Sequence, residues 1–166
     1  MIQKKICMIG TSAVGKTSLV AKYVHGQFSD KYLTTVGVKI DKRVVTVDDT
    51  EVTLVLWDLE GDDDFQKLKT SYLRGTNGYL LVSDGTRGVT LDLAKEIHGR
   101  VVEAVGAVPF LLAVNKADLA AQWEISDARL ETFTAQGWKV IKTSAKEGLG
   151  VEEAFVELAR QMIKPS

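Results

Sequence analysis

Short apolar runs alternate along this chain with polar stretches in which apolar residues recur at helical spacing. The run over 2–9 predicts a first strand, which stops at Gly10, and helical spacing begins near Lys16. The same alternation predicts further strands over 36–47, 51–58, 79–83, 110–114 and 138–141, and further helices over 91–105, 127–135 and 151–163. The expected inward faces are Leu19, Val20 and Tyr23 in the first helix and Val151, Ala154, Phe155, Leu158 and Met162 in the last.

This alternation predicts an α/β fold. The strands over 36–47 and 51–58 are joined through 48–50, where aspartate tolerates the positive φ of a hairpin turn, so that pair is expected to be antiparallel. The continuous apolar run over 110–114 is typical of a central parallel strand covered on both faces. We expect one domain over 1–166, with a six-stranded, mostly parallel sheet, one antiparallel edge strand and helices on both faces. Ligands of such sheets bind outside the carboxyl ends of the strands.

Composition narrows the functions that this fold can serve. The 166 residues include 21 Lys plus Arg and 22 Asp plus Glu, so no overall basic field is present to hold a nucleic acid. The single cysteine, Cys7, lies in an apolar run and predicts a buried thiol rather than a disulfide or a metal site. No apolar run reaches the ~18 residues that a bilayer span needs, and the start of the chain lacks a signal pattern. We expect a cytoplasmic protein without an integral membrane segment.

The segment over 10–17 has the spacing of a phosphate-binding loop. It reads G-T-S-A-V-G-K-T, which fits G-x-x-x-x-G-K-[ST], and it lies between a predicted strand and a predicted helix. An ordinary glycine turn that caps a helix is the plainer interpretation. Glycines let backbone N–H groups point inward, and the helix start adds the positive end of its dipole. Lys16 is expected to reach the β and γ phosphates, and the Thr17 hydroxyl to ligate Mg²⁺. The expected nucleotide contacts in this loop are Ser12, Ala13, Val14, Gly15, Lys16, Thr17 and Ser18.

The string N-K-A-D over 115–118 directly follows the strand predicted over 110–114. The Asp118 carboxylate can accept hydrogen bonds from the guanine N1–H and exocyclic amine, a donor pair that adenine does not present. Asn115 is expected to brace the loop, and the Lys116 stem to cover one face of the base. These residue types therefore favour guanine over adenine.

The string T-S-A-K over 143–146 follows the next strand and offers the Ala145 N–H to the guanine O6. Each of these strings is weak evidence alone. In this order, and each after a strand, they resemble the motifs of the Ras-like small GTPases over essentially the whole chain. The resemblance implies a P-loop NTPase G domain, with a base site formed by Asn115, Lys116, Asp118, Ser144, Ala145 and Lys146.

The first switch segment resembles that of the Rab branch. The string over 32–37, Y-L-T-T-V-G, looks like a Rab-type switch I, which implies that Thr35 is the second hydroxyl ligand of Mg²⁺. Phe28 is similar to the aromatic residue that packs against the base in this family.

The second switch segment is also Rab-like. The string over 57–61, W-D-L-E-G, implies that Asp58 holds Mg²⁺ through water and that the Gly61 N–H senses the γ phosphate, and Y-L-R-G over 72–75 continues the resemblance. The implied function is a switch that binds Mg²⁺ with GTP or GDP, hydrolyses GTP to GDP, and meets protein effectors and regulators through segments near 30–40 and 58–74.

Switch II departs from the family pattern at Asp62, where the family has a glutamine that orients the attacking water. An amide both donates and accepts hydrogen bonds, whereas a carboxylate only accepts and adds negative charge beside the phosphates. We therefore expect slow intrinsic hydrolysis. Two alternatives remain: Asp62 or Glu60 acts as a base toward water, or 62–64 is a solvated acidic stretch. The expected catalytic residues are Lys16, Thr35, Gly61 and Asp62.

Two other functions compete with the switch. One is a regulatory module that holds GTP or GDP and rarely hydrolyses it; the other is an ATP-using P-loop enzyme, against which Asp118 argues. The chain ends over 163–166 without the prenylated cysteines typical of Rab and Ras proteins. We expect either that the protein carries no lipid anchor, as in an unlipidated prokaryotic member, or that its end is shortened; peripheral membrane association stays open.

Several other residues invite functional interpretations that the sequence does not favour. His25 and His98 lack a second histidine or cysteine at metal-ligand spacing, so surface packing is expected. Asp84 lies at a strand end and is interpreted as a structural loop carboxylate. Nothing in the sequence directs Arg74 or Arg87 toward a phosphate as an arginine finger. Core or half-buried packing is expected of Trp57, Trp123 and Trp138.

Overall fold

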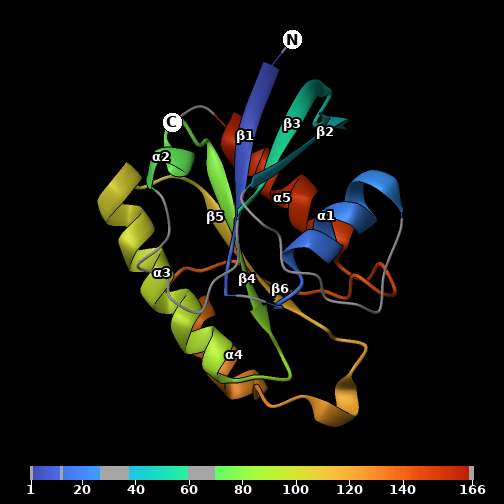
Figure 1. The fold of residues 1–166 in the computed structure, drawn as a ribbon, viewed down its shortest axis with the longest axis vertical. Helices are drawn as coiled ribbons and strands as arrows, with labels where there is room; N and C mark the ends of the chain where they lie inside the picture. The colour runs from blue at the N-terminus through green and yellow to red at the C-terminus, as the bar shows by residue number, and fades with distance from the viewer. Residues whose placement is uncertain (1, 12, 27–37, 60–69, 165–166) are drawn as a thin grey trace.

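The computed structural model describes residues 2–11, 13–26, 38–59 and 70–164 (Figure 1). In these residues the strands form a six-stranded sheet in the order β2-β3-β1-β4-β5-β6. The antiparallel pair is β2 with β3; the pairs of β1 with β3, β1 with β4, β4 with β5 and β5 with β6 are parallel. The strands are β1 (Ile2–Ile9), β2 (Val38–Val47), β3 (Thr50–Leu59), β4 (Gly78–Asp84), β5 (Phe110–Asn115) and β6 (Val140–Lys142). The predicted fold class, with one antiparallel edge strand, is confirmed.

Helices cover both faces of the sheet (Figure 1). On one face α1 (Lys16–His25) and α5 (Val151–Ile163) join a cluster with Met8 and Leu54 of the sheet. On the other, α3 (Val89–Val105) and α4 (Asp127–Ala135) join a cluster with Cys7 and Leu81. No helix in the described ranges is both long and apolar enough to cross a membrane. The residues predicted to face inward from α1 and α5 are all buried, as are Cys7 and the continuous strand over 111–114.

The β2–β3 hairpin turn is shorter than the sequence suggested. Asp48 and Asp49 have φ values of 49° and 67°, which is the pattern of a two-residue turn with both central residues left-handed. Thr50 pairs with Val47 and belongs to β3, so the prediction of a three-residue turn was wrong. The expectation that aspartate adopts positive φ at this turn is confirmed.

The last strand begins later than predicted, at Val140 rather than 138. Trp138 instead packs edge-on against Phe110 and Phe133, with ring centroids 5.0 and 4.9 Å apart. His98 joins this aromatic cluster, with its ring centroid 4.3 Å from that of Phe110. Its Nδ1 lies 2.7 Å from the Tyr79 hydroxyl, and burial lowers the pKa of His98. His98 is therefore half-buried and packs against neighbouring rings, so it is less exposed than surface packing alone suggests.

Short helical segments were not predicted. They are α2 (Thr70–Leu73) and a 3₁₀ turn, η2 (Ala120–Gln122). Both are too short for apolar periodicity to mark them. The three tryptophans are half-buried, as expected.

Candidate functional site

The loop between β1 and α1 has a backbone that only certain residues accept. Gly10 lies against β4, where an added Cβ would come 2.5 Å from the Val82 carbonyl oxygen. Ala13 and Gly15 adopt positive φ values of 62° and 107°. Gly15 is the N-cap of α1 and makes no side-chain capping hydrogen bond. No side chain at Gly15 therefore caps the start of α1, and the N-terminal end of a helix suits an anion.

Lys16 lies folded into this loop. Its side chain is buried, and its Nζ donates to the carbonyl oxygens of Gly10 and Thr11 at 2.7 and 3.1 Å. Burial lowers the pKa of Lys16 to about 8, and the negative charge of Asp58 opposes that shift. A polyanion in the loop would stabilise the ammonium further.

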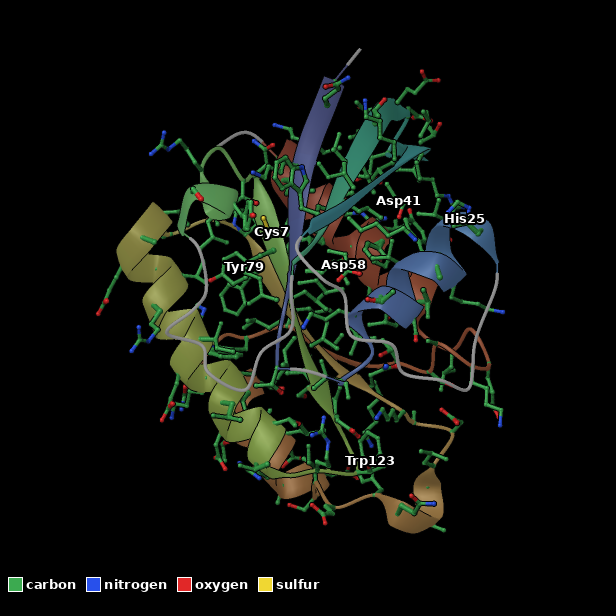
Figure 2. The ribbon with its side chains drawn as sticks, viewed as in Figure 1. Cys7, His25, Asp41, Asp58, Tyr79 and Trp123 are labelled. Carbon is green, nitrogen blue, oxygen red and sulfur yellow. The ribbon has the colours of Figure 1, made fainter. Side chains whose placement is uncertain are left out.

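Thr17 and Asp58 bring a hydroxyl and a carboxylate together beside the loop. The Thr17 Oγ1 donates to the Asp58 Oδ2 at 2.6 Å. Asp58 is fully buried near the carboxyl end of β3, and its register partner in β1 is Met8. Figure 2 shows Asp58 between the sheet and α1. Hard oxygen donors of this kind fit Mg²⁺, which binds few protein ligands and takes the rest from phosphates and water.

The loop after β5 is fastened to the loop after β1. The Asn115 Nδ2 donates to the Val14 carbonyl oxygen at 3.0 Å, and the Lys116 Nζ donates to the Ala13 carbonyl oxygen at 2.9 Å. Lys116 itself has a positive φ of 71°, which is unusual outside glycine. These contacts join residues about a hundred positions apart and set the spacing between the two loops.

The loop after β6 is hydrogen-bonded to the residues over 115–118, at the end of β5 and in the loop after it. Ser144 donates through its Oγ to the Asp118 Oδ1 at 2.8 Å, and Thr143 donates through its Oγ1 to the Asn115 Oδ1 at 3.1 Å. Ser144 and Ala145 are buried, whereas Lys146 is exposed. One carboxylate oxygen of Asp118 is therefore oriented by a side chain, so the carboxylate has a fixed direction in which to accept further hydrogen bonds.

Comparison with known proteins identifies the family. The model of the Ras family matches residues 5–164. The chain belongs to the Ras family. It is 33% identical over 161 residues to the Ras-related protein Rab-8 of Diplobatis ommata, across 96% of this chain and 77% of that protein. It is 31% identical over 164 residues to Rab-13 of Bos taurus, across 98% of this chain and 81% of that protein. It is 33% identical over 167 residues to Rab-7a of Dictyostelium discoideum, across 96% of this chain and 82% of that protein.

These relatives place the chain in the Rab-like branch of the Ras-like small GTPases. As a Ras-family protein it is a GTP-binding switch of a class that hydrolyses GTP and uses Mg²⁺ with the nucleotide. Proteins of this family also meet effectors and regulators.

Several predicted site residues of this Ras-family chain lie outside the described residues. They are Ser12, Phe28, Thr35, Glu60, Gly61 and Asp62, together with the rest of the acidic stretch over 62–64. The predicted site residues that the structure does describe lie at the carboxyl edge of the sheet. They come from the loop after β1 and the start of α1, from the ends of β3 and β5, and from the loops after β5 and β6. Lys16, Thr17 and Asp58 lie together, and Asn115, Lys116, Asp118 and Ser144 are joined by the contacts given above.

One buried carboxylate of this Ras-family chain contacts the site although the sequence did not predict that it would. Asp84, the last residue of β4, accepts a salt bridge from the Lys116 Nζ at 2.7 Å. The sequence could have indicated this contact. The strands predicted over 79–83 and 110–114 follow one another along the chain, and the carboxyl ends of parallel strands meet at one edge of the sheet.

The histidines take no part in a metal site of the described ranges, where no group of three or more His, Cys, Asp or Glu residues could hold a metal ion. His25 is exposed at the end of α1, with its Nε2 3.5 Å from the Asp41 Oδ1, and both are labelled in Figure 2. A site for Mg²⁺ at Thr17 and Asp58 is compatible with this finding, because hydroxyl and phosphate oxygens supply the other ligands.

Proposed function

We propose that this Ras-family chain is a guanine-nucleotide switch whose intrinsic GTP hydrolysis is slow, with the nucleotide held by the loops after β1, β5 and β6. The observation that carries the proposal is the pair of contacts from Asn115 and Lys116 to the carbonyl oxygens of Val14 and Ala13. They hold a base-recognition loop at a fixed distance from a phosphate-binding loop. A site that only bound phosphate would not need this link.

Phosphate binding is assigned to the loop over 10–17. The Lys16 ammonium moves from its carbonyl acceptors to the β and γ phosphates, and the N–H groups at the start of α1 donate to phosphate oxygens. Ser12, Ala13, Val14, Gly15 and Ser18 supply the remaining contacts. The depressed pKa of Lys16 supports this role, because a buried ammonium gains most from an anion.

Base binding is assigned to the loops over 115–118 and 143–146. The Asp118 carboxylate accepts from the guanine N1–H and amine, and the Ser144 hydroxyl keeps it in that orientation. Ala145 donates its N–H to the guanine O6, and Phe28 and the Lys116 stem cover the ring of the base. Lys146 is the last residue assigned to the base site. Guanine is preferred because adenine would leave the Asp118 carboxylate without these donors.

Magnesium binding is assigned to Thr17, Asp58 and Thr35. Bound there, Mg²⁺ would neutralise part of the charge on the phosphates. Thr17 would hold the ion through its hydroxyl, and Asp58 would hold it through water. Thr35 is assigned by the resemblance alone.

Slow turnover is assigned to Asp62. Water attacks the γ phosphate in line, and the Gly61 N–H stabilises the phosphate oxygens. A carboxylate at 62 cannot donate a hydrogen bond to the phosphate and repels it, so the water is poorly oriented. The same substitution favours a second candidate, a module that holds GTP or GDP and rarely hydrolyses it. Partners meet either form through the segments near 30–40 and 58–74.

Single-turnover hydrolysis of Mg²⁺·GTP tests this proposal. The Asp62→Gln variant is expected to hydrolyse GTP at least tenfold faster than the unmodified protein, with GDP affinity unchanged. A tenfold change in rate corresponds to a change of about 1.4 kcal/mol in the activation free energy. Asp64→Asn, in the same acidic stretch, is the matched control and should leave the rate unchanged. A slower Asp62→Gln variant would mean that the carboxylate positions or activates the water.

Ligand competition separates the rival functions. GDP should displace a fluorescent GDP analogue at far lower concentration than ATP does, and equal displacement by ATP would contradict a guanine site. A single turnover too slow to measure, with tight GTP binding, would support the regulatory module instead of the switch.

A further inference from the structure

Asp84 is a fully buried carboxylate that contacts Lys116 of the proposed nucleotide site. It ends β4, and its register partner in β5 is Asn115, the first residue of the base-recognition loop. A buried charge is costly unless it is paired and hydrogen-bonded, so its surroundings say what it is for.

Both oxygens of the Asp84 carboxylate accept hydrogen bonds. Oδ1 accepts from the backbone N–H and the hydroxyl of Thr86, at 2.8 and 2.7 Å. Oδ2 accepts from the Arg87 Nε at 3.0 Å and from the Lys116 Nζ at 2.7 Å. Although burial raises the pKa of the Asp84 carboxyl, the hydrogen bonds from Lys116, Thr86 and Arg87 hold it below its usual value. Asp84 is therefore an ionised group with a defined orientation.

Lys116 joins this carboxylate to the phosphate-binding loop. Its Nζ donates both to Asp84 and to the Ala13 carbonyl oxygen, and only 9% of its side chain is exposed. Its backbone adopts a φ of 71°, a conformation that non-glycine residues occupy only where their surroundings compel it. An ion pair of 2.7 Å at the far end of the side chain supplies that restraint.

We propose that Asp84 is a positioning residue for nucleotide binding, which fixes the Lys116 ammonium so that its stem covers the guanine base and its amine braces the phosphate-binding loop at Ala13. This inference rests on the proposed function of the site. Without the carboxylate, the buried ammonium turns toward water, and both the base and the loop at Ala13 lose a support. The result is faster release of GDP.

A purely structural role is the competing explanation. The Thr90 Oγ1 donates to the Asp84 carbonyl oxygen at 3.1 Å and accepts from its N–H at 2.8 Å, and the Arg87 N–H donates to the same carbonyl at 3.0 Å. These backbone contacts hold the turn after β4 without the carboxylate. The two roles differ in one respect: only positioning makes the effect of Asp84 depend on Lys116.

A double-mutant cycle separates them. The release of a fluorescent GDP analogue, chased with excess GDP in Mg²⁺, is measured for the unmodified protein, Asp84→Asn, Lys116→Met and the double variant. Asp84→Asn should release the analogue about ten- to a hundredfold faster, because hydrogen bonds to charged groups contribute about 1.5–3 kcal/mol. In the Lys116→Met background the same change should have no further effect.

Arg87→Gln is the matched control. Arg87 donates to the same carboxylate oxygen, but 40% of its side chain is exposed, so its removal should change the release rate less than about twofold. If Asp84→Asn fails to fold, Thr86→Ala replaces it: it removes one hydrogen bond from the carboxylate, keeps every charge, and should speed release only where Lys116 is present.

The outcomes are distinct. Unchanged release from Asp84→Asn, or an equal acceleration with and without Lys116, overturns the positioning role while the guanine site stands. An unmodified protein that does not retain the GDP analogue overturns the proposed function, and the positioning role with it.

Discussion

Lys16 gives up most of its hydration for two carbonyl acceptors in the phosphate-binding loop. Burial lowers its pKa to about 8, with Asp58 acting in the opposite direction. The side chain therefore stays largely protonated at pH 7, but it loses its proton as the pH rises through 8. A bound polyphosphate keeps the proton in place, because negative charge favours the ammonium. Nucleotide binding and proton binding at Lys16 are thus linked.

This linkage predicts a pH dependence of GDP affinity. Between pH 7 and 8.5 the nucleotide-free protein loses the Lys16 proton and the bound protein keeps it, so affinity should fall about fourfold. Titration calorimetry at pH 8.5, in buffers of different ionisation enthalpy, should show uptake of a proton on binding. Lys16→Met should bind GDP more weakly and take up less. Equal affinity at both pH values, with no proton uptake, would rule out the linkage.

A motif that fixes the spacing lets the sequence predict the chemistry of single residues. The types and order of Lys16, Thr17 and Asp118 predict their ligands, and these roles stay predictions. The partnership of Asp84 with Lys116 was not, because it joins side chains from separate strands and no local pattern records it. The packing partners of His98 were not predictable for the same reason, since Tyr79 lies in β4 and Phe110 in β5.

Among the elements, the β2–β3 hairpin carries two non-glycine residues at positive φ. Asp48 is held by α5, since the Arg160 Nε lies 3.1 Å from its Oδ2. Asp49 has a φ of 67° and an exposed side chain, and the second position of such a turn favours glycine. The backbone conformation at Asp49 therefore leaves room for stabilisation.

Asp49→Gly should stabilise the protein by about 0.5–1 kcal/mol, because glycine adopts left-handed φ without a Cβ clash. Urea unfolding at fixed, saturating GDP and Mg²⁺ measures the change. Thr46→Gly is the control in the same hairpin: it lies at an exposed, extended position of β2 and should destabilise the protein by about as much. A destabilised Asp49→Gly variant would show that the Asp49 side chain contributes more than the strain costs.

Strong periodicity decided which elements the sequence could predict. The helix over 151–163 and the continuous strand over 110–114 follow directly from their apolar patterns. The four-residue α2 and the start of β6 do not, because α2 is about one helical turn, in which an apolar period cannot recur, and the start of β6 depends on where Trp138 packs. Local pattern thus predicts an element, and tertiary contacts set its ends.

For the molecule as a whole, the sheet order brings distant segments to one edge. Because β1 lies between β3 and β4, and β5 lies next to β4, the start of α1 meets Asp58 of β3, and the loop before α1 meets Asn115 at the end of β5. Thr17 and Asp58 are 41 residues apart along the chain. A cation bound at this pair therefore stabilises the contact of α1 with the centre of the sheet, and folding stability should depend on Mg²⁺.

Adding Mg²⁺ to the GDP-saturated protein should raise Tm by about 5–10 °C, because a ligand at 100 times its Kd stabilises by about 2.7 kcal/mol. Thermal unfolding with excess EDTA or with Mg²⁺ measures the increment. Asp58→Asn should lose most of it, and Glu103→Gln, on the exposed side of α3, should keep it. An Asp58→Asn variant with the full Mg²⁺ increment would place the metal elsewhere, because removing a ligand charge must weaken the site that it belongs to.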